Sequence, residues 1–237
     1  MPLKNSIEEV VEYKGKRTQR SRGHERREAI LRAALQIIAR DGMRAVRHRA
    51  VAKEANVPLA ATTYYFKDIN ELIYDAFAYF AAEGDKLKAK LEERSFAALS
   101  ALTPEQLKHA DAREQFLVHL TELVAEHIYD QVDHSDDRRV ENSFHMRALY
   151  DNELSAMLAY KRNEMRPKIS RFFSVWGLPD PESDTEAFLA LVLHLEYETL
   201  SARLREDTEP DVRRILKNFL SHLLNRQGES NVSKDIH

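Results

Sequence analysis

The sequence contains no cysteine, so it can form neither a disulfide bond nor a site in which a thiolate binds metal or acts as a nucleophile. Glycine and proline are also scarce, with 6 and 7 among 237 residues, and no long alternation of apolar and polar residues predicts a strand. Because 43% of the residues are hydrophobic, the chain can still bury a substantial core. Together these features predict an all-α fold.

Long hydrophobic runs are missing as well. The longest run, FLALVLHL at residues 188–195, is too short to span a bilayer. The first residues, MPLKNSIEEVVEYKGK, lack the uninterrupted apolar core of a signal peptide. We therefore expect a soluble protein of the cytoplasm.

Common catalytic and metal-binding motifs are absent from the sequence. There is no glycine-rich phosphate loop, no H-E-x-x-H zinc motif and no G-x-S-x-G nucleophile motif. HLEYE, at residues 194–198, places acids beside a histidine but lacks a second histidine. His119 and His127 are two helical turns apart, which is too far for joint coordination of a metal ion without a third helix. We predict no enzyme activity, no metal site and no cofactor.

Positive charge is concentrated near the N-terminus. Residues 14–53 contain 13 Lys or Arg and three acids, a net charge of +10, whereas the whole chain carries −3, so the remainder carries −13. A basic segment attached to an acidic remainder favours contact between that segment and a polyanion. A solvated helix face with a basic tail gives the same charge pattern and remains an alternative at this point.

Apolar spacing and capping residues predict four helices in the N-terminal third. The first spans residues 25–41 and ends at Gly42, which suits a left-handed C-cap. Short helices follow at residues 47–55 and 58–65, and Asp68 is a good N-cap for a fourth helix. Two short helices joined by a tight turn form a helix-turn-helix, whose second helix enters the major groove of DNA.

The segment VPLAATTYYF, at residues 57–66, suits this second helix. Its alanines allow the backbone to approach DNA, and its hydroxyl groups can reach phosphates or base edges. Its last two aromatic residues, Tyr65 and Phe66, are predicted to anchor the helix to the core. The alternative, an aromatic-rich core helix, does not explain the adjacent basic segment.

Three features together resemble the N-terminal DNA-binding domain of the TetR family of bacterial regulators: the first helix ending at Gly42, RHRAVAKEANV at 47–57 and PLAATTYYFKDINELI at 58–73. The similarity covers about residues 26–80. It implies a homodimer in which a three-helix helix-turn-helix domain precedes a larger helical domain for effector binding and dimerisation. The predicted DNA contacts are Arg20, Arg22, Arg44, Arg47, Arg49, Lys53, Ala60, Ala61, Thr62, Thr63, Tyr64 and Lys67.

This sequence departs from the family pattern at several positions of the helix-turn-helix, and also at Ile69, where a lysine often begins the fourth helix. Family members usually have a basic residue where Leu59 stands and glycine where Ala60 stands. A Ser or Thr commonly opens the second helix, whereas Val46 and Arg47 occupy that region here, so we expect a weak cap. His48 is expected to be buried against the first helix, with a phosphate contact as the alternative.

Four segments are predicted along the chain: a basic flexible arm at 1–24, the helix-turn-helix domain at 25–80, the ligand-binding and dimerisation domain at 81–227 and a flexible tail at 228–237. Basic residues of the arm continue to Arg27 without apolar periodicity, which predicts disorder until DNA is bound. The arm then either lies in the minor groove or stays solvated.

Helices continue through the second domain but carry no specific motif. Apolar spacing predicts a short helix at 104–110 and longer helices at 114–131 and 141–160, which the polar loop HSDDR separates. A further helix is predicted to end at Gly177, and Pro167 is expected to kink or restart it. The resemblance implies an effector pocket, although a Phe or Leu at helical spacing is more often core. The candidate ligand-binding residues are Phe116, Leu120, Leu123, Phe144, Leu149, Tyr150, Phe172, Phe173 and Trp176.

The last two predicted helices, at 184–205 and from Pro210 onward, have wide apolar faces. In TetR-like proteins the corresponding helices of two subunits form a four-helix dimer interface, whereas periodicity alone also fits core packing within one subunit. The predicted dimer residues are Phe188, Leu191, Val192, Leu195, Ile215, Leu216, Phe219 and Leu223.

The resulting interpretation is a ligand-responsive homodimeric transcriptional regulator. It is expected to be a repressor that a small, partly apolar effector releases from a palindromic operator in double-stranded DNA. Two alternatives remain: a DNA-binding architectural protein that binds no small molecule, and a helical enzyme or binding module whose basic segment is incidental.

Overall fold

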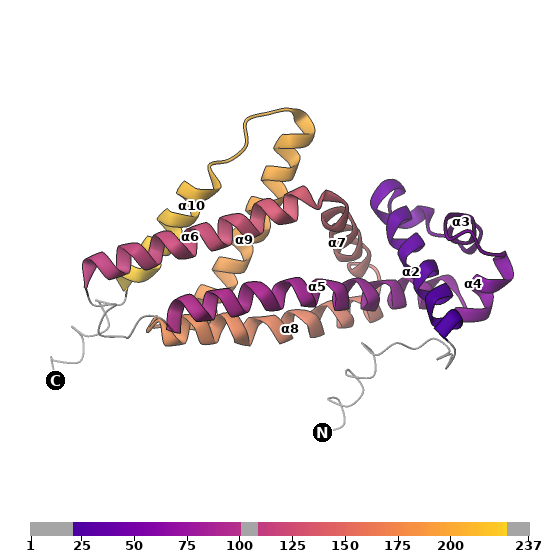
Figure 1. Cartoon of the computed structure of the whole chain (residues 1–237), viewed down its shortest axis with the longest axis horizontal. Helices are drawn as coiled ribbons and strands as arrows, with labels where there is room; N and C mark the ends of the chain where they lie inside the picture. The colour runs from indigo at the N-terminus through magenta and orange to yellow at the C-terminus, as the bar shows by residue number, and fades with distance from the viewer. Residues whose placement is uncertain (1–20, 101–108, 227–237) are drawn as a thin grey trace, which may run out of the picture. The chain divides into compact units, whose positions relative to one another are not determined.

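The computed structural model describes residues 21–100 and 109–226, and these ranges contain nine α-helices, one 3₁₀ turn and no strand (Figure 1). The predicted all-α fold is confirmed. The chain divides into two compact units, each with its own hydrophobic core. Unit 1 takes the residues up to Lys86 together with Ser135–Arg162, and unit 2 takes Leu87–His134 together with the residues from Asn163 onward.

Unit 1 is built around its first helix. The elements of unit 1 are α2 (Ser21–Asp41), η1 (Met43–Ala45), α3 (His48–Glu54), α4 (Leu59–Tyr65), the first part of α5 (Ile69–Ser100), α7 (Ser135–Ala148) and the beginning of α8 (Asn152–Val175). Helix α2 packs against α3, η1 and α7, and α3 packs against α4 (Figure 1). The three-helix arrangement predicted for the N-terminal domain is therefore present.

Local sequence signals set the ends of these helices. Gly42 follows α2 with a φ of 81°, which glycine adopts more readily than other residues, as its predicted C-cap role requires. Asp68 Oδ1 accepts the backbone N–H groups of Asn70 and Glu71 at 2.9 and 3.0 Å, while Glu71 accepts the N–H of Lys67. The Asp68 side chain therefore caps the start of α5, as predicted. Arg47, before α3, makes no side-chain capping bond, so the expected weak cap is confirmed.

The core of unit 1 is mainly aliphatic along α2, and its aromatic side chains come from the end of α4, from α5 and from α7. Ile30, Leu31 and Ile38 are almost completely buried. Tyr65 and Phe66 are also buried, as predicted. Each such side chain contributes about 1.5–3 kcal/mol when removed from water. Helix α7 completes this core with Phe144, whose ring lies 5.2 Å from that of Phe77.

The burial of Arg27 is the clearest difference between the predicted and the observed structure of unit 1. The sequence places it in a flexible basic arm, but α2 begins at Ser21 and Arg27 is only 1% exposed inside the core. Its guanidinium forms an ion pair with Asp75 of α5 and lies over the ring of Phe66, 5.0 Å from the centroid. Burial lowers the pKa of Arg27 to about 10, and the Asp75 carboxylate opposes this shift. The side chain stays charged at neutral pH and joins α2, α5 and the end of α4.

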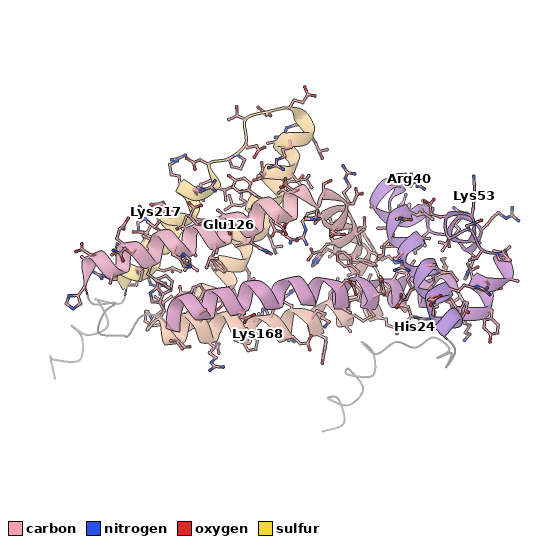
Figure 2. All side chains as sticks on the ribbon, in the orientation of Figure 1. His24, Arg40, Lys53, Glu126, Lys168 and Lys217 are labelled. Atoms are coloured by element: carbon pink, nitrogen blue, oxygen red, sulfur yellow. The ribbon has the colours of Figure 1, made fainter. Side chains whose placement is uncertain are left out.

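Unit 2 is assembled around α6 (Ala110–Asp133), which packs against α9 (Pro181–Arg205) and α10 (Val212–Asn225) (Figure 1). Its core contains a continuous cluster of rings from α6 and α8, in which Trp176 lies 5.3 Å from Phe116 and 6.1 Å from Phe173. Ion pairs from Lys217 to Glu114 at 2.6 Å and from Arg213 to Glu122 at 2.9 Å join α10 to α6; Figure 2 labels Lys217.

Three predicted boundaries are wrong in the second half of the chain. The segment 134–138 is not a loop, because α7 begins at Ser135 with Asp136 and Asp137 in its first turn, where acids favour the helix dipole. The predicted helix at 141–160 is interrupted after Ala148, and Asp151 caps α8 by accepting the N–H of Leu154. Helix α8 continues through Pro167 without restarting. The short helix expected at 104–110 lies mostly outside the described residues.

Candidate nucleic-acid interface

Helix α4 has one exposed face, which contains Leu59, Ala60, Thr63 and Tyr64. Helical spacing of one, four and five residues places these side chains together. Tyr64 is 55% exposed, and its ring meets Tyr65 edge-on at 5.1 Å between centroids. The Thr63 hydroxyl reaches only the carbonyl of Ala60, at 3.3 Å. This face presents small and hydroxyl-bearing side chains to solvent.

Two of the predicted contacts on α4 lie on other faces of the helix. Thr62 is completely buried, and its hydroxyl donates to the carbonyl of Leu59 at 2.8 Å. Thr62 therefore does not present its hydroxyl to DNA, which corrects that prediction. Ala61 is partly buried and packs against the core of unit 1. The opposite face of α4, with Ala61, Thr62 and Tyr65, packs against the core of unit 1 and anchors the helix there.

Exposed basic side chains lie on the elements before and after α4. Arg44, Arg47, Arg49 and Lys53 are exposed on η1 and α3, and Lys67 is exposed just before α5. Figure 2 labels Lys53, which extends away from α3. Among the described residues none of these five cations has an ion-pair partner. Arg22 lies at the start of α2, but its side chain and the whole of Arg20 are outside the described residues.

Arg40 belongs to the basic segment but has an internal role in unit 1. Its guanidinium donates two hydrogen bonds to the carboxylate of Glu54, at 3.2 and 3.1 Å, and a third to Asp41 at 3.0 Å. The bond to Glu54, followed by that to Asp41, raises the pKa of Arg40 above its usual value. The side chain thereby joins the end of α2 to the end of α3 (Figure 2).

The candidate ligand-binding residues do not form one group. Phe116, Leu120, Phe172, Phe173 and Trp176 share the core of unit 2, where the rings contact one another. Leu123 is also buried, on α6. Phe144 belongs to the core of unit 1 instead, and Leu149 and Tyr150 are 71% and 85% exposed in the turn between α7 and α8. Phe144, Leu149 and Tyr150 therefore lie in unit 1 and the other six candidates in unit 2, and all nine stay predictions.

Polar side chains of unit 2 are buried near the aromatic cluster. Glu196 on α9 is 4% exposed, and its carboxylate lies 3.7 Å from Nε2 of His127 on α6. Thr121 and Thr199 are buried on the same two helices, and their hydroxyl oxygens have no hydrogen-bond partner among the described residues. Buried polar atoms of this kind are uncommon in a purely structural core.

The predicted dimer residues also divide into two classes. Val192, Leu195, Leu216 and Leu223 are buried in the core of unit 2, and their role as dimer contacts stays a prediction. Phe188, Leu191, Ile215 and Phe219 are partly buried against the same core. The exposed apolar side chains of α9 are Leu193, Tyr197 and Leu204, at 51%, 58% and 63%. Spacings of four and seven residues align these three on one face.

Comparison with known proteins agrees with the geometry of unit 1. Residues 30–76, which span α2 to the first turns of α5, match the sequence pattern of the family described as bacterial regulatory proteins, tetR family. The helix-turn-helix segment of unit 1 is therefore similar to the DNA-binding segment of that family. No curated protein matches the sequence of the whole chain significantly.

Solved structures extend the similarity beyond the helix-turn-helix. A transcriptional regulator from Saccharomonospora viridis, solved in complex with choline, is 20% identical, covers 84% of this chain and 97% of its own, and gives a TM-score of 0.59. A TetR-family regulator from a Rhodococcus species is 23% identical and covers 84% and 99%, with a TM-score of 0.56. A TetR regulator from Haloarcula marismortui is 17% identical and covers 85% and 97%, with a TM-score of 0.54. These proteins share the fold.

The described part of the chain contains neither a membrane-spanning helix nor a cluster of metal ligands. None of its helices combines the length and the hydropathy needed to cross a membrane. Over residues 21–100 and 109–226, no three His, Asp or Glu side chains gather in a way that could hold a metal ion.

Arg147 takes part in a network of polar contacts in unit 1 that the sequence did not predict. Arg147 on α7 donates to Asp151 from Nε and to Asn70 of α5 from one Nη, both at 3.2 Å. Asp151 also accepts the hydroxyl of Tyr74, and burial together with this bond raises the pKa of Tyr74 to about 12. Residues 77 positions apart meet here, so no local signal in the sequence could have revealed the contact.

Proposed function

We propose that this protein belongs to the TetR family and is a homodimeric, ligand-responsive repressor that binds a palindromic operator and is released from it by a small effector. It acts in the cytoplasm, where the DNA of a prokaryotic cell lies, and has no enzymatic activity. The observation that carries this proposal is the exposed face of α4, with Thr63 and Tyr64 at its centre and unpaired cations on the elements before and after it.

The proposed DNA contacts follow from this arrangement. Helix α4 would enter the major groove, where Thr63 and Tyr64 reach base edges and phosphates. Arg49 and Lys53 of α3 would bind phosphates on either side of the groove, because exposed cations without an internal partner lose little when they contact DNA. Such phosphate contacts position the protein, whereas the α4 side chains specify the sequence.

Dimerisation supplies the second half of the recognition surface. A seven-residue helix is about 10 Å long and reads only a few base pairs. Two such helices related by a twofold axis read a palindrome with half-sites about 34–36 Å apart, or a multiple of this distance. The apolar stripe of Leu193, Tyr197 and Leu204 on α9 is the part of the interface that we assign to the partner subunit.

Unit 2 is the proposed site of effector binding. Its ring cluster offers an apolar lining, and Glu196, His127 and the hydroxyls of Thr121 and Thr199 offer polar groups that could orient a ligand. The choline complex of the Saccharomonospora viridis protein supports binding of a small organic molecule by this fold. In some conformations of the dimer, the distance between the two α4 helices would not match the spacing of the half-sites. An effector that binds such a conformation more tightly would increase its population and weaken operator binding.

Selection of DNA fragments by the full-length protein at physiological salt tests this function. The protein should enrich a palindromic sequence, and Tyr64→Ala should bind that sequence more weakly. Tyr150→Ala is the matched control, because Tyr150 is an exposed tyrosine outside the proposed interface. A correctly folded dimer that enriches no sequence would contradict the proposal, and an operator complex indifferent to a broad set of metabolites would favour an architectural protein.

A further inference from the structure

A groove in unit 1 is lined by residues of η1, α3, α5 and α7. Its volume is about 360 Å³, within the range of small-molecule sites. The lining residues are Met43, Arg44, Val46, Arg47, His48, Ile69, Asn70, Ile73 and Arg147. Three of them are arginines and none is acidic, so the groove has a strongly positive lining. We infer that this groove is a binding site for a small organic anion.

Arg147 is already held in position for such a ligand. Its Nε donates to Asp151 and one of its Nη groups donates to Asn70, and Asp151 is itself fixed by Tyr74 and by capping α8. The second Nη group has no hydrogen-bond partner among the described residues. A guanidinium held on one edge keeps its remaining donors in a defined direction, which favours binding of a carboxylate or phosphate.

The other polar groups of the groove lack internal partners. Arg44 and Arg47 are exposed and form no ion pair with any described residue. Nδ1 of His48 is shielded from solvent and has no hydrogen-bond partner in the part of the chain that the structure describes. Two unpaired guanidinium groups and a third held by Asp151 leave the groove with uncompensated positive charge, which an oxyanion would neutralise.

The floor of the groove distinguishes an organic anion from a phosphate of the DNA backbone. Val46 and Ile73 are buried beneath it at 5% and 4% exposure, and Met43 and Ile69 are partly buried beside them. A backbone phosphate has no apolar group to cover such a surface. A ligand with both an acidic group and a small apolar part would use the arginines and the floor together.

Because the groove includes predicted DNA contacts, a ligand bound there would affect operator binding; this consequence rests on the proposed function. Arg44 and Arg47 are also predicted DNA contacts, so an anion that occupies the groove would compete with operator phosphates for their guanidinium groups. The ligand would also bridge α3 to α7, two elements that otherwise have no direct hydrogen bond among the described residues. The groove would be separate from the effector site proposed in unit 2.

Ligand-observed NMR titration of the full chain tests the site with three probes at constant ionic strength. Phenyl phosphate has both parts of the inferred ligand, inorganic phosphate has only the charge, and phenol has only the ring. Phenyl phosphate should bind roughly tenfold more tightly than either of the others, because it uses both features of the groove. Equal binding of phenyl phosphate and inorganic phosphate would overturn the inference.

Arginine variants locate the bound probe. Arg147→Gln and Arg47→Gln should each weaken phenyl phosphate binding roughly tenfold or more. Arg139→Gln is the matched control, since Arg139 also lies on α7 and pairs with a nearby acid, Asp136 at 3.1 Å, but does not line the groove. Arg47 has no internal partner among the described residues, so its variant remains informative if Arg147→Gln unfolds. Unchanged binding by a folded Arg47→Gln would overturn the site.

A DNA titration separates the inference from the proposed function. If phenyl phosphate does not bind while Arg147→Gln reduces the salt slope of DNA binding by about one, the groove holds a backbone phosphate and the inference is wrong. If phenyl phosphate binds as expected but no operator exists, the site stands and the repressor proposal fails. When both hold, phenyl phosphate should lower operator affinity more than inorganic phosphate does.

Discussion

Unit 1 and unit 2 use their basic side chains in different ways. In unit 2, arginine and lysine residues pair with acids on neighbouring helices, as Arg203 does with Asp133 at 2.5 Å and Lys217 with Glu114 at 2.6 Å. Around α3 and α4 of unit 1, Arg49 and Lys53 have no such partner among the described residues. Among the described residues, unit 1 therefore leaves a group of exposed cations without an internal partner, Arg44, Arg47, Arg49, Lys53 and Lys67, for an external polyanion.

This difference indicates function because surface ion pairs contribute little to stability. An exposed pair is worth about 0–1 kcal/mol, so a fold loses little by leaving cations unpaired. Arg27 and Arg40 show that unit 1 also pairs arginines when they join its helices. A count of basic residues along the sequence cannot separate these internal arginines from those that face a partner.

The largest expected effect comes from breaking the internal ion pair of unit 1. Arg27→Met should lower the free energy of unfolding by about 3–5 kcal/mol, because it leaves the buried carboxylate of Asp75 uncompensated. Urea denaturation followed by circular dichroism measures this loss. Arg26→Met is the control, since Arg26 is exposed on the same helix.

The double variant Arg27→Met with Asp75→Leu sharpens this prediction. Replacing both buried charges by apolar side chains should restore much of the lost stability. Restoration would show that the penalty arises from the unpaired charge. If Arg27→Met alone costs less than about 1 kcal/mol, the pair does not hold α2 to α5 as the structure indicates.

The second prediction concerns the exposed apolar stripe of unit 2. Leu193→Glu should weaken dimerisation by about 2 kcal/mol or more, roughly 30-fold, because it places a charge in an apolar interface. Sedimentation equilibrium measures the dimer dissociation constant. Leu149→Glu is the matched control, because it introduces the same change at an exposed leucine of unit 1. Equal dimer stability in both variants would remove this stripe from the interface.

The third prediction distinguishes the two faces of α4. Tyr64→Ala and Thr63→Ala should each weaken operator binding by about 1–3 kcal/mol with little change in thermal stability. Thr62→Val should show the reverse pattern, since its buried hydroxyl bonds to Leu59 within the helix. Fluorescence anisotropy with operator DNA, together with thermal melts, tests both. Operator binding that is lost only in Thr62→Val would reverse our assignment of the faces.

The fourth prediction concerns the basic residues that precede α2. Deleting residues 1–20 should weaken DNA binding broadly and flatten its salt dependence. The slope of log K against log salt should change by about 0.9 for each phosphate that the shortened protein no longer neutralises. The deletion stops before Ser21 so that α2 stays intact. An unchanged slope would mean that this segment does not bind phosphate.

The smallest expected effects test the comparison of the two units directly. Lys53→Met should reduce the salt slope of DNA binding by about one and leave stability unchanged. Lys217→Met should leave DNA binding unchanged and alter stability by no more than about 1 kcal/mol, because it breaks an exposed pair. Figure 2 labels both lysines. Similar effects of the two variants on DNA binding would contradict the distinction between paired and unpaired cations.

The sequence by itself determined the features that depend on neighbouring residues. Gly42, Asp68 and the aromatic pair at Tyr65 and Phe66 act within a few positions of the helix ends they control, so their roles were predictable. The all-α fold and the helix-turn-helix follow from apolar spacing, which is also a local property. The start of α7 escaped prediction because its first turns contain almost no apolar residue.

Only the tertiary structure decided which side chains of a given type are internal. Arg27 is buried because Asp75, 48 residues later, and the ring of Phe66 lie beside it. Phe144 joins unit 1 and Phe116 joins unit 2, although both appear as apolar residues at helical spacing. Periodicity shows that a side chain faces inward, but its neighbours come from helices distant in the sequence, and packing between helices selects them.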